Sequence, residues 1–156
     1  PLAHIQEHSC EVQVPFIQYL VEKTGKTFRI VPICMWMQDL QTATEIGAAI
    51  AKTSQELERD VVIVASTDFT HYKPHDIAYH NDHQVLDAIE ALDEKAVMSR
   101  VEELNVTMCG FGPVNASLVY SKLMGAEKAE VLKYATSGDI TGDRSAVVGY
   151  AAVVIR

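Results

Sequence analysis

Hydrophobic and polar residues follow one another along this chain in patterns that predict both strands and helices. An unbroken β-branched run, V-V-I-V at residues 61–64, predicts a strand buried on both faces, as is typical of the centre of a parallel sheet. Further apolar runs predict strands at 28–35, 130–134 and 146–155. Pro32 removes one ladder donor from the first of these and therefore indicates an edge strand.

Apolar residues at helical spacing predict five helices, at 15–23, 43–57, 81–92, 94–104 and 113–124. Asp39 or Thr42 is expected to cap the second helix and Asp93 the fourth, while Gly25 is expected to end the first. Residues 73–80 combine a proline with several kinds of polar group and predict a loop over a crevice.

These elements together predict an α/β fold. A strand at 28–35, a helix and a strand at 61–64 form a unit whose right-handed crossover would make the two strands parallel. We therefore expect a sandwich with a mixed, mostly parallel central sheet flanked by helices. With 156 residues, 48% of them hydrophobic, the chain is long enough to bury one core, which predicts a single domain over residues 1–156. Because it begins at Pro1, in dense motif-like sequence, we expect a removed methionine or an absent upstream part.

Charge and cysteine content narrow the functional classes. A formal charge of -8, with no offsetting cluster of Lys and Arg, argues against nucleic acid as a partner. The apolar runs are too short for a membrane-spanning helix. Cys10, Cys34 and Cys109 are odd in number and irregularly spaced, which favours a reducing compartment over a disulfide framework. The sequence thus predicts a cytoplasmic protein that binds neither nucleic acid nor membrane.

Polar and ionisable residues follow directly after the central apolar run, in S-T-D-F-T-H-Y at residues 66–72. In open α/β sheets, ligands bind at the carboxyl ends of strands. His71 can pass a proton near neutral pH, and the carboxylate of Asp68 can fix its tautomer, so both are catalytic candidates. The alternative is a simple turn in which Asp68 caps the next segment and His71 is only exposed.

Cys109 follows a second break in the pattern, T-M-C-G-F-G-P at residues 107–113, ahead of a predicted helix. Helix amides stabilise a thiolate, which suits a metal ligand or a reactive thiol. The alternative is a small buried hydrophobic residue. Glu7 and His8 place an acid beside an imidazole and are candidate substrate-binding residues, although adjacent side chains need not face the same way.

Two further groups are minor candidates for metal binding. His75, His80 and His83 have helix-like separations, yet the surrounding polar run also fits a solvated loop. Asp139 and Asp143 distantly resemble a calcium loop but lack its terminal Glu.

Four stretches, taken together, resemble the Memo family. They are E-H-S-C-E-V-Q-V-P-F at 7–16, S-T-D-F-T-H-Y at 66–72, M-C-G-F-G-P at 108–113 and S-G-D-I-T-G-D-R-S-A-V-V-G-Y-A at 137–151. Their order and spacing also match, and the last is closer to the prokaryotic members than to the animal ones.

The resemblance implies a fold similar to the class III extradiol ring-cleaving dioxygenases, which use non-haem iron. The Memo pocket is lined by two N-terminal His residues, a Cys in the C-G motif and a His in the S-x-D-F-x-H motif; the last two correspond to Cys109 and His71. The two N-terminal motifs, similar to P-H-A-G and P-S-H, have no counterpart here. The chain thus resembles the C-terminal half of a Memo protein, with a domain that is incomplete at its N-terminus.

The resemblance also implies a function. A thiolate at Cys109 replaces the dioxygenases' carboxylate ligand and favours softer metals, so the expected cofactor is iron, copper or zinc, held with two His from the missing half. We expect a metal-dependent redox or non-haem dioxygenase-like site, in line with the copper- and iron-linked redox role described for animal members. The alternative is a non-catalytic protein that binds a small molecule or peptide in the same cleft. Asp68, His71 and Cys109 should converge, and a companion N-terminal chain or a homo-oligomer should cover the exposed sheet.

Overall fold

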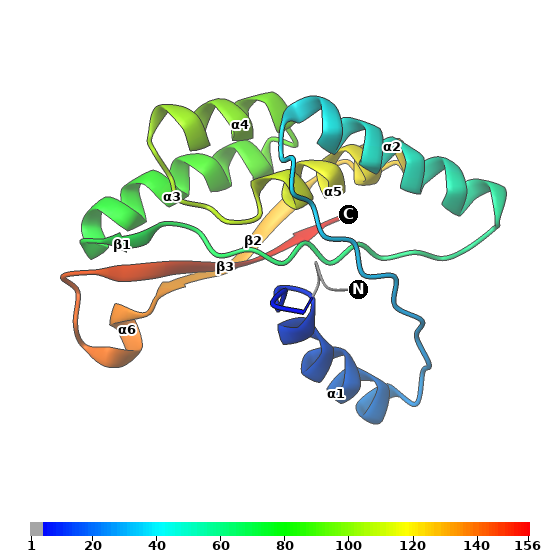
Figure 1. Ribbon diagram of the computed structural model, residues 1–156, viewed down its shortest axis with the longest axis horizontal. Helices are drawn as coiled ribbons and strands as arrows, with labels where there is room; N and C mark the ends of the chain where they lie inside the picture. The colour runs from blue at the N-terminus through cyan, green and yellow to red at the C-terminus, as the bar shows by residue number, and fades with distance from the viewer. Residues whose placement is uncertain (1–4) are drawn as a thin grey trace. The chain divides into compact units, whose positions relative to one another are not determined.

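The computed structural model describes residues 5–156 and divides the chain into two compact units, Pro1–Trp36 and Met37–Arg156 (Figure 1). Each unit is described by itself below. The single domain expected over residues 1–156 stays a prediction. Pro1, on which the expectation of an absent upstream part rests, lies outside the described residues.

The first unit contains one α-helix, α1 (Val14–Thr24), preceded by a short 3₁₀ helix. Pro15 lies in the first turn of α1, where its missing N–H costs no hydrogen bond. Gly25 ends the helix with a φ of 68°, as expected for a left-handed C-cap. Both predictions for this helix are confirmed.

The strand predicted at 28–35 does not form. Residues 25–35 have no regular secondary structure, and apolar side chains among them are exposed, Val31 by 81%. β-branched residues favour an extended backbone, but a strand also needs a neighbour to receive its hydrogen bonds. Within the described part of the first unit no strand takes that place.

The second unit is built on four long helices, which are α2 (Leu40–Glu56), α3 (His75–Glu90), α4 (Glu94–Glu103) and α5 (Phe111–Leu123). Asp39 and Asp93 cap α2 and α4 with their side chains, as the sequence predicted. The loop predicted at 73–80 is wrong. Pro74 is the N-cap of α3, so the helix begins at once at His75 and includes most of the expected loop.

The sheet of the second unit has three strands, β1 (His71–Lys73), β2 (Ala129–Thr136) and β3 (Val147–Ile155), in the order β1-β3-β2. Both pairs are antiparallel, with the short helix α6 (Gly138–Thr141) between β2 and β3. The α/β class is confirmed, but this sheet is antiparallel where a mostly parallel one was expected. The expected parallel pair needed strands at 28–35 and 61–64, and neither segment pairs in the described part of the chain.

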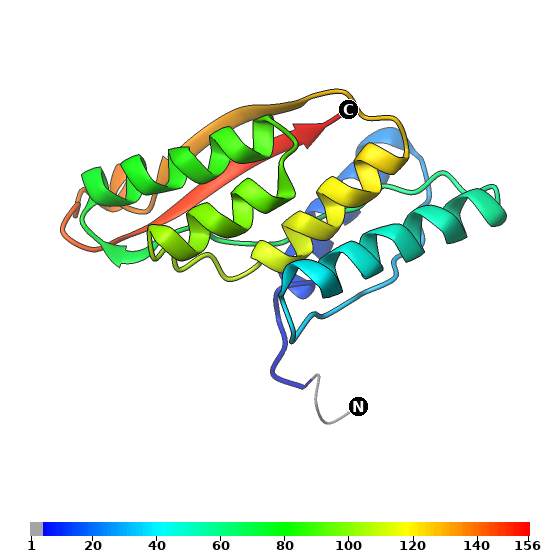
Figure 2. The same cartoon turned by 90° about the horizontal axis from the view of Figure 1, so that it is seen from above.

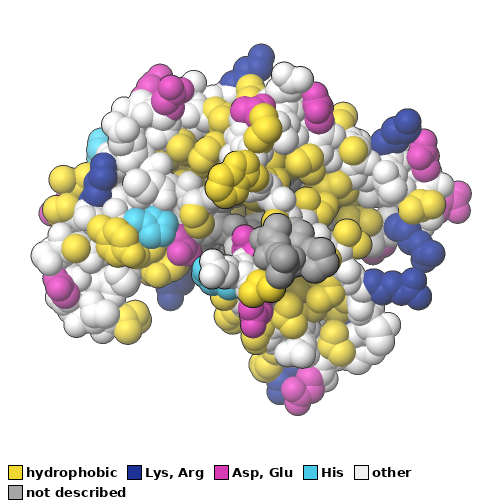
Figure 3. Space-filling model, viewed as in Figure 1, with side chains coloured by type: hydrophobic (Ala, Val, Ile, Leu, Met, Phe, Trp, Pro, Cys, Tyr) yellow, Lys and Arg dark blue, Asp and Glu magenta, His cyan; other side chains and the backbone are white. Residues whose placement is uncertain are grey.

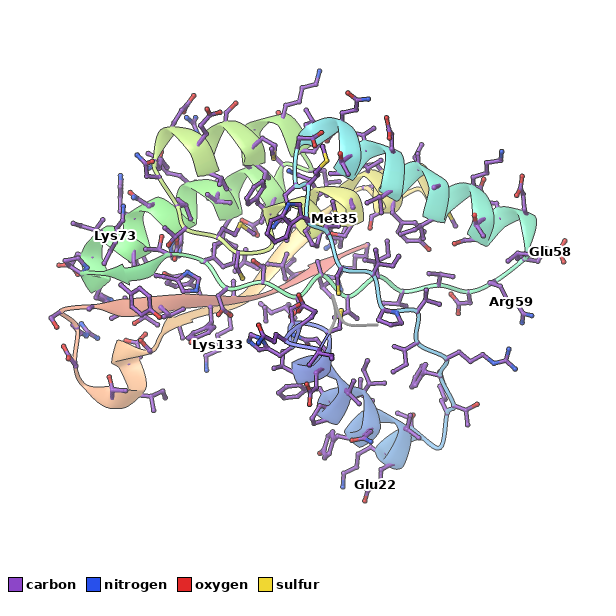
Figure 4. All side chains as sticks on the ribbon, in the orientation of Figure 1. Glu22, Met35, Glu58, Arg59, Lys73 and Lys133 are labelled. Carbon is purple, nitrogen blue, oxygen red and sulfur yellow. The ribbon has the colours of Figure 1, made fainter. Side chains whose placement is uncertain are left out.

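The apolar run at 61–64 lies in an open segment that leads from the end of α2, near Glu58 and Arg59, to β1 (Figures 1 and 4). Val62 and Val64 are 82% and 57% exposed, while the side chains between and beside them are partly buried. One face is thus covered and the other open, so burial on both faces is wrong for this structure. The view in Figure 3 shows hydrophobic side chains at many points of the surface.

The core of the second unit lies between the sheet and the long helices, which cover one of its faces (Figures 1 and 2). The cluster joins residues from α3, α4, α5 and the segments between them, including Val85, Leu86, Ile89, Val97, Met108 and Leu118. Phe69, at the end of the open segment, is 2% exposed and belongs to the same cluster. None of the helices in residues 5–156 combines the length and apolarity needed to cross a membrane.

Acid should weaken the second unit partly through Asp39. Hydrogen bonds from the backbone N–H and the hydroxyl of Thr42, at 2.9 and 2.8 Å, lower the pKa of Asp39 below its ordinary value of 3.8. This contribution to stability is present above the unfolded-state pKa and is lost as the pH falls through the lowered one. The Asp39→Asn variant keeps a capping oxygen but has no carboxyl group to titrate at this position. Below about pH 4, the melting temperature of this variant should therefore fall less than that of the wild type.

The measurement is thermal unfolding between neutral and strongly acidic pH. Asp87→Asn, an exposed position within α3, is the control and should follow the wild type. If the melting temperatures of the wild type and Asp39→Asn fall equally as the pH is lowered, the ionised Asp39 does not contribute to stability as proposed.

Candidate functional site

Asp68, His71 and Cys109 lie together in the second unit. The His71 Nε2 atom is 3.7 Å from Asp68 Oδ2. The backbone N–H of Asp68 donates to Cys109 Sγ at 3.2 Å, and the N–H of Cys109 donates to the Asp68 carbonyl at 3.3 Å. The structure therefore brings the three residues together across about forty positions of sequence.

The imidazole of His71 is oriented by Thr107. Its Nδ1 atom is 2.9 Å from the Thr107 carbonyl oxygen, which can only accept, so Nδ1 carries the proton and donates. The Nε2 lone pair of the neutral ring is then on the side of Asp68. A proton gained at Nε2 would place a cation beside that carboxylate. This arrangement suits a proton acceptor, and it is also how metal-ligating histidines are held.

Cys109 is exposed, so the alternative of a small buried hydrophobic residue is wrong. Gln38 holds the turn around it, because its amide N–H₂ donates to the Cys109 carbonyl at 3.0 Å and its amide oxygen accepts from the N–H of Gly112 at 2.9 Å. The Thr67 hydroxyl lies 3.8 Å from Cys109 Sγ. A thiolate here would receive the Asp68 N–H and lie just before the N-terminus of α5, and both favour negative charge.

Gly110 allows the two chain segments of the site to approach. A Cβ atom at this position would lie 2.6 Å from the Ser66 carbonyl oxygen and 2.7 Å from Thr67 Cβ, closer than real side chains come. The N–H of Gly110 instead donates to the Thr67 hydroxyl at 2.8 Å.

Two tyrosines near the site were missed in the sequence. Burial raises the pKa of Tyr150, and the negative charge of Asp68 raises it further, which places the phenol in the field of that carboxylate. Tyr72 has a left-handed φ of 58°, its ring centroid is 5.8 Å from that of His71, and 79% of it is exposed. Tyr150 follows Gly149 within a predicted strand, and these two residues were the only local hint of its role. The hint becomes informative only when the antiparallel pairing of that strand is known.

Asp82 was also missed. It is fully buried in α3, where Oδ1 accepts the backbone N–H and the hydroxyl of Thr70 at 3.1 and 2.6 Å, and Oδ2 accepts the Tyr134 hydroxyl at 2.7 Å. Burial raises the pKa of Asp82, while the bonds from Thr70 and Tyr134 act in the opposite direction. A Cβ atom at Gly149 would collide with this carboxylate. The signal was an acid on the otherwise apolar face of a helix.

Glu7 and His8 belong to the first unit and are described only within it. Glu7 Oε1 accepts the N–H of Ser9 at 2.6 Å, and bonds with Ser9 lower the pKa of Glu7. Their assignment to substrate binding stays a prediction.

The three histidines of α3 have other partners. His75 Nδ1 is 2.9 Å from the Thr136 hydroxyl, His80 Nε2 is 3.1 Å from the Gln84 amide, and His83 Nδ1 is 2.7 Å from a backbone carbonyl of the preceding turn. Within residues 5–156, no three His, Cys, Asp or Glu side chains are arranged to hold a metal ion. These histidines are therefore accounted for by local structure.

Asp139 and Asp143 also have structural partners. Asp139 accepts from the backbone N–H of Thr136 at 2.8 Å and pairs with Arg144 at 3.1 Å. Asp143 accepts from the N–H and hydroxyl of Ser145 at 2.9 and 2.6 Å. Both carboxylates thus organise the turn between β2 and β3.

Comparison with known proteins gives one consistent result. Residues 1–154 match the family model described as Memo-like protein. A MEMO1 family protein of Methanopyrus kandleri is 56% identical over 99% of this chain and 53% of its own length. Family members of Methanothermobacter thermautotrophicus and Methanocaldococcus jannaschii are 53% and 52% identical, over 96% and 99% of this chain and 52% and 54% of their own lengths. The chain thus spans about half the length of the curated relatives it matches.

Proposed function

This chain belongs to the Memo-like family, and from that premise and the geometry of its site we propose that it forms part of a metal-dependent redox or dioxygenase-like site. Cys109 is the metal ligand, and His71, assisted by Asp68, carries a proton to or from the substrate. The substrate is a small molecule or a peptide, and the protein acts in the cytoplasm. The observation that carries the proposal is that the His71 ring and the Cys109 thiol both lie next to Asp68, at 3.7 Å from its carboxylate and 3.2 Å from its backbone nitrogen respectively.

The donor atoms only partly fit a metal. A thiolate at Cys109 is a ligand that iron, copper or zinc accepts, and the metal would supply Lewis-acid or electron-transfer chemistry. In the described range, however, no group of three His, Cys, Asp or Glu side chains is arranged to complete the set. The proposal therefore requires ligands from outside it, and the family resemblance implies two histidines in that role.

The proton chemistry follows from this chain's own residues. Neutral His71 presents Nε2 as an acceptor for a hydroxyl or amine proton of the substrate, and the resulting imidazolium lies beside the Asp68 carboxylate. The Thr107 carbonyl keeps Nδ1 protonated throughout, so Nε2 alone exchanges the proton and can return it to the product.

Metal content tests the ligand assignment. In the full-length protein, Cys109→Ser replaces a soft thiolate by an alcohol, and metal affinity should fall by about a hundredfold or more. Cys34→Ser is the matched control, because this thiol is also exposed but is not assigned to the metal, and its metal content should equal that of the wild type. An unchanged affinity in Cys109→Ser, measured by metal analysis and competition with a chelator, would remove Cys109 from the metal site.

A non-catalytic binding protein is the second candidate. It is favoured by the exposed rings of Tyr72, next to His71, and of Tyr150, near Asp68, which offer aromatic contact area to a ligand. Full metal binding without oxygen or redox turnover on any of a panel of substrates would favour this function over catalysis.

We also propose that the open face at Val62 and Val64 is covered by a companion polypeptide corresponding to the half of the relatives that this chain does not match. There the segment at 61–64 would become a central strand of a larger, mostly parallel sheet of the dioxygenase type. Unpaired extended backbone with exposed apolar side chains is a ready site for pairing with another strand.

Hydrodynamics tests this surface. The chain alone should self-associate through the open face, and Val62→Lys with Val64→Lys should reduce that association because charge on a strand edge opposes pairing. Ile77→Lys is the control, since Ile77 is 48% exposed but lies on the helix α3 and not at a strand edge. A monomeric wild-type chain in sedimentation velocity would count against the proposal, whereas a stable dimer of the chain would identify a second copy as the cover.

A further inference from the structure

We propose that Asp82 is a positioning residue for the site, because through Thr70 it holds the segment that carries Asp68 and His71 and so sets the orientation and tautomer of the imidazole. The inference rests on the proposed function in taking His71 as the proton carrier. The positioning itself can be measured without turnover.

Thr70 is held at each of its polar groups. Its N–H and its hydroxyl both donate to Asp82 Oδ1, at 3.1 and 2.6 Å, and its carbonyl accepts the N–H of Gly149 at 2.9 Å. Thr70 and Asp82 are both 0% exposed, so water does not compete for these bonds. The backbone at Thr70 is therefore fixed from α3 on one side and from β3 on the other.

His71 follows directly and has little freedom of its own. Its backbone N–H donates to the Thr107 hydroxyl at 2.7 Å, and its ring donates to the Thr107 carbonyl. Tyr72 comes next with its left-handed φ, a backbone state that persists where the surroundings over-determine it. A displacement of Thr70 is consequently passed to the His71 ring and lengthens its bond with Thr107.

The second oxygen of Asp82 provides a control within the same carboxylate. Oδ2 accepts the Tyr134 hydroxyl at 2.7 Å, a bond that leads to β2, and it accepts the Thr70 N–H only at the longer distance of 3.4 Å. Loss of the Tyr134 bond should destabilise the fold without moving His71.

The experiment records the ¹⁵N resonances of the His71 ring in the full-length protein at about pH 8, where a histidine of ordinary pKa is neutral, assigned with His71→Gln. Thr70→Val removes one donor and keeps the side-chain shape, so the ring should shift from the Nδ1–H towards the Nε2–H tautomer. Thr70→Ser restores the donor and should retain the wild-type spectrum, as should Tyr134→Phe. Asp82→Leu, which removes both acceptor oxygens, should behave like Thr70→Val where it folds.

An unchanged His71 tautomer in Thr70→Val, with a melting temperature lowered as in Tyr134→Phe, would show that Asp82 is only structural. The proposed function is tested separately. A shifted tautomer together with unchanged metal affinity in Cys109→Ser would sustain the positioning role and reject the metal site.

Discussion

His71→Gln is expected to lower turnover of the full-length protein by about 10²–10⁴-fold, the usual contribution of a positioned acid or base. Glutamine can still donate to the Thr107 carbonyl, but it has no basic nitrogen to place beside Asp68. Oxygen or substrate consumption measures the loss, and metal analysis should show most of the metal retained.

His80→Gln is the matched control for this prediction. His80 lies on α3 against Gln84, so its replacement should leave turnover at the wild-type level. Equal activities for the two variants would exclude His71 as the proton carrier. A loss of both metal and turnover in His71→Gln would instead make His71 a ligand.

Asp82→Ala should remove a large part of the stability of the second unit. It leaves two fully buried donors without an acceptor, the N–H and hydroxyl of Thr70, and one partly buried donor, the hydroxyl of Tyr134. Each unsatisfied buried group costs about 1–3 kcal/mol, so the two at Thr70 alone cost about 2–6 kcal/mol, against a free energy of unfolding of about 5–15 kcal/mol for a typical domain.

Urea unfolding followed by circular dichroism measures this effect. Asp87→Ala removes the same side chain from an exposed position of the same helix and should change the midpoint little. A midpoint for Asp82→Ala close to that of Asp87→Ala would show that the three donors find other acceptors.

Local chemistry made much of the second unit predictable. Asp39 and Asp93 indicate where helices begin, because a side-chain oxygen can accept hydrogen bonds from the free N–H groups of the first turn. The segment at 146–155 is rich in β-branched residues and indicated β3, and the apolar and aromatic residues within 130–134 indicated β2. The convergence of Asp68 with Cys109 was also foreseeable, since both follow abrupt ends of apolar patterns.

Properties set by partners in space were not predictable in this way. The run at 61–64 has the composition of a doubly buried strand, yet exposure depends on which segments lie beside it, and one face here is open. Pro74 signalled a loop, although the same fixed φ also suits a helix start. Asp82 could be recognised as an acid on an apolar helix face, but nothing local shows that Thr70 and Tyr134 will meet it.

Gly110 has an evolutionary consequence. Because Gly110 has no side chain, the backbone of Thr67 can lie against the turn that presents Cys109. A replacement of Cys109 would leave this close approach intact, whereas any gain of bulk at position 110 would first require the two segments to separate. We therefore expect substitutions in this C-G pair to be accepted more readily at position 109 than at position 110.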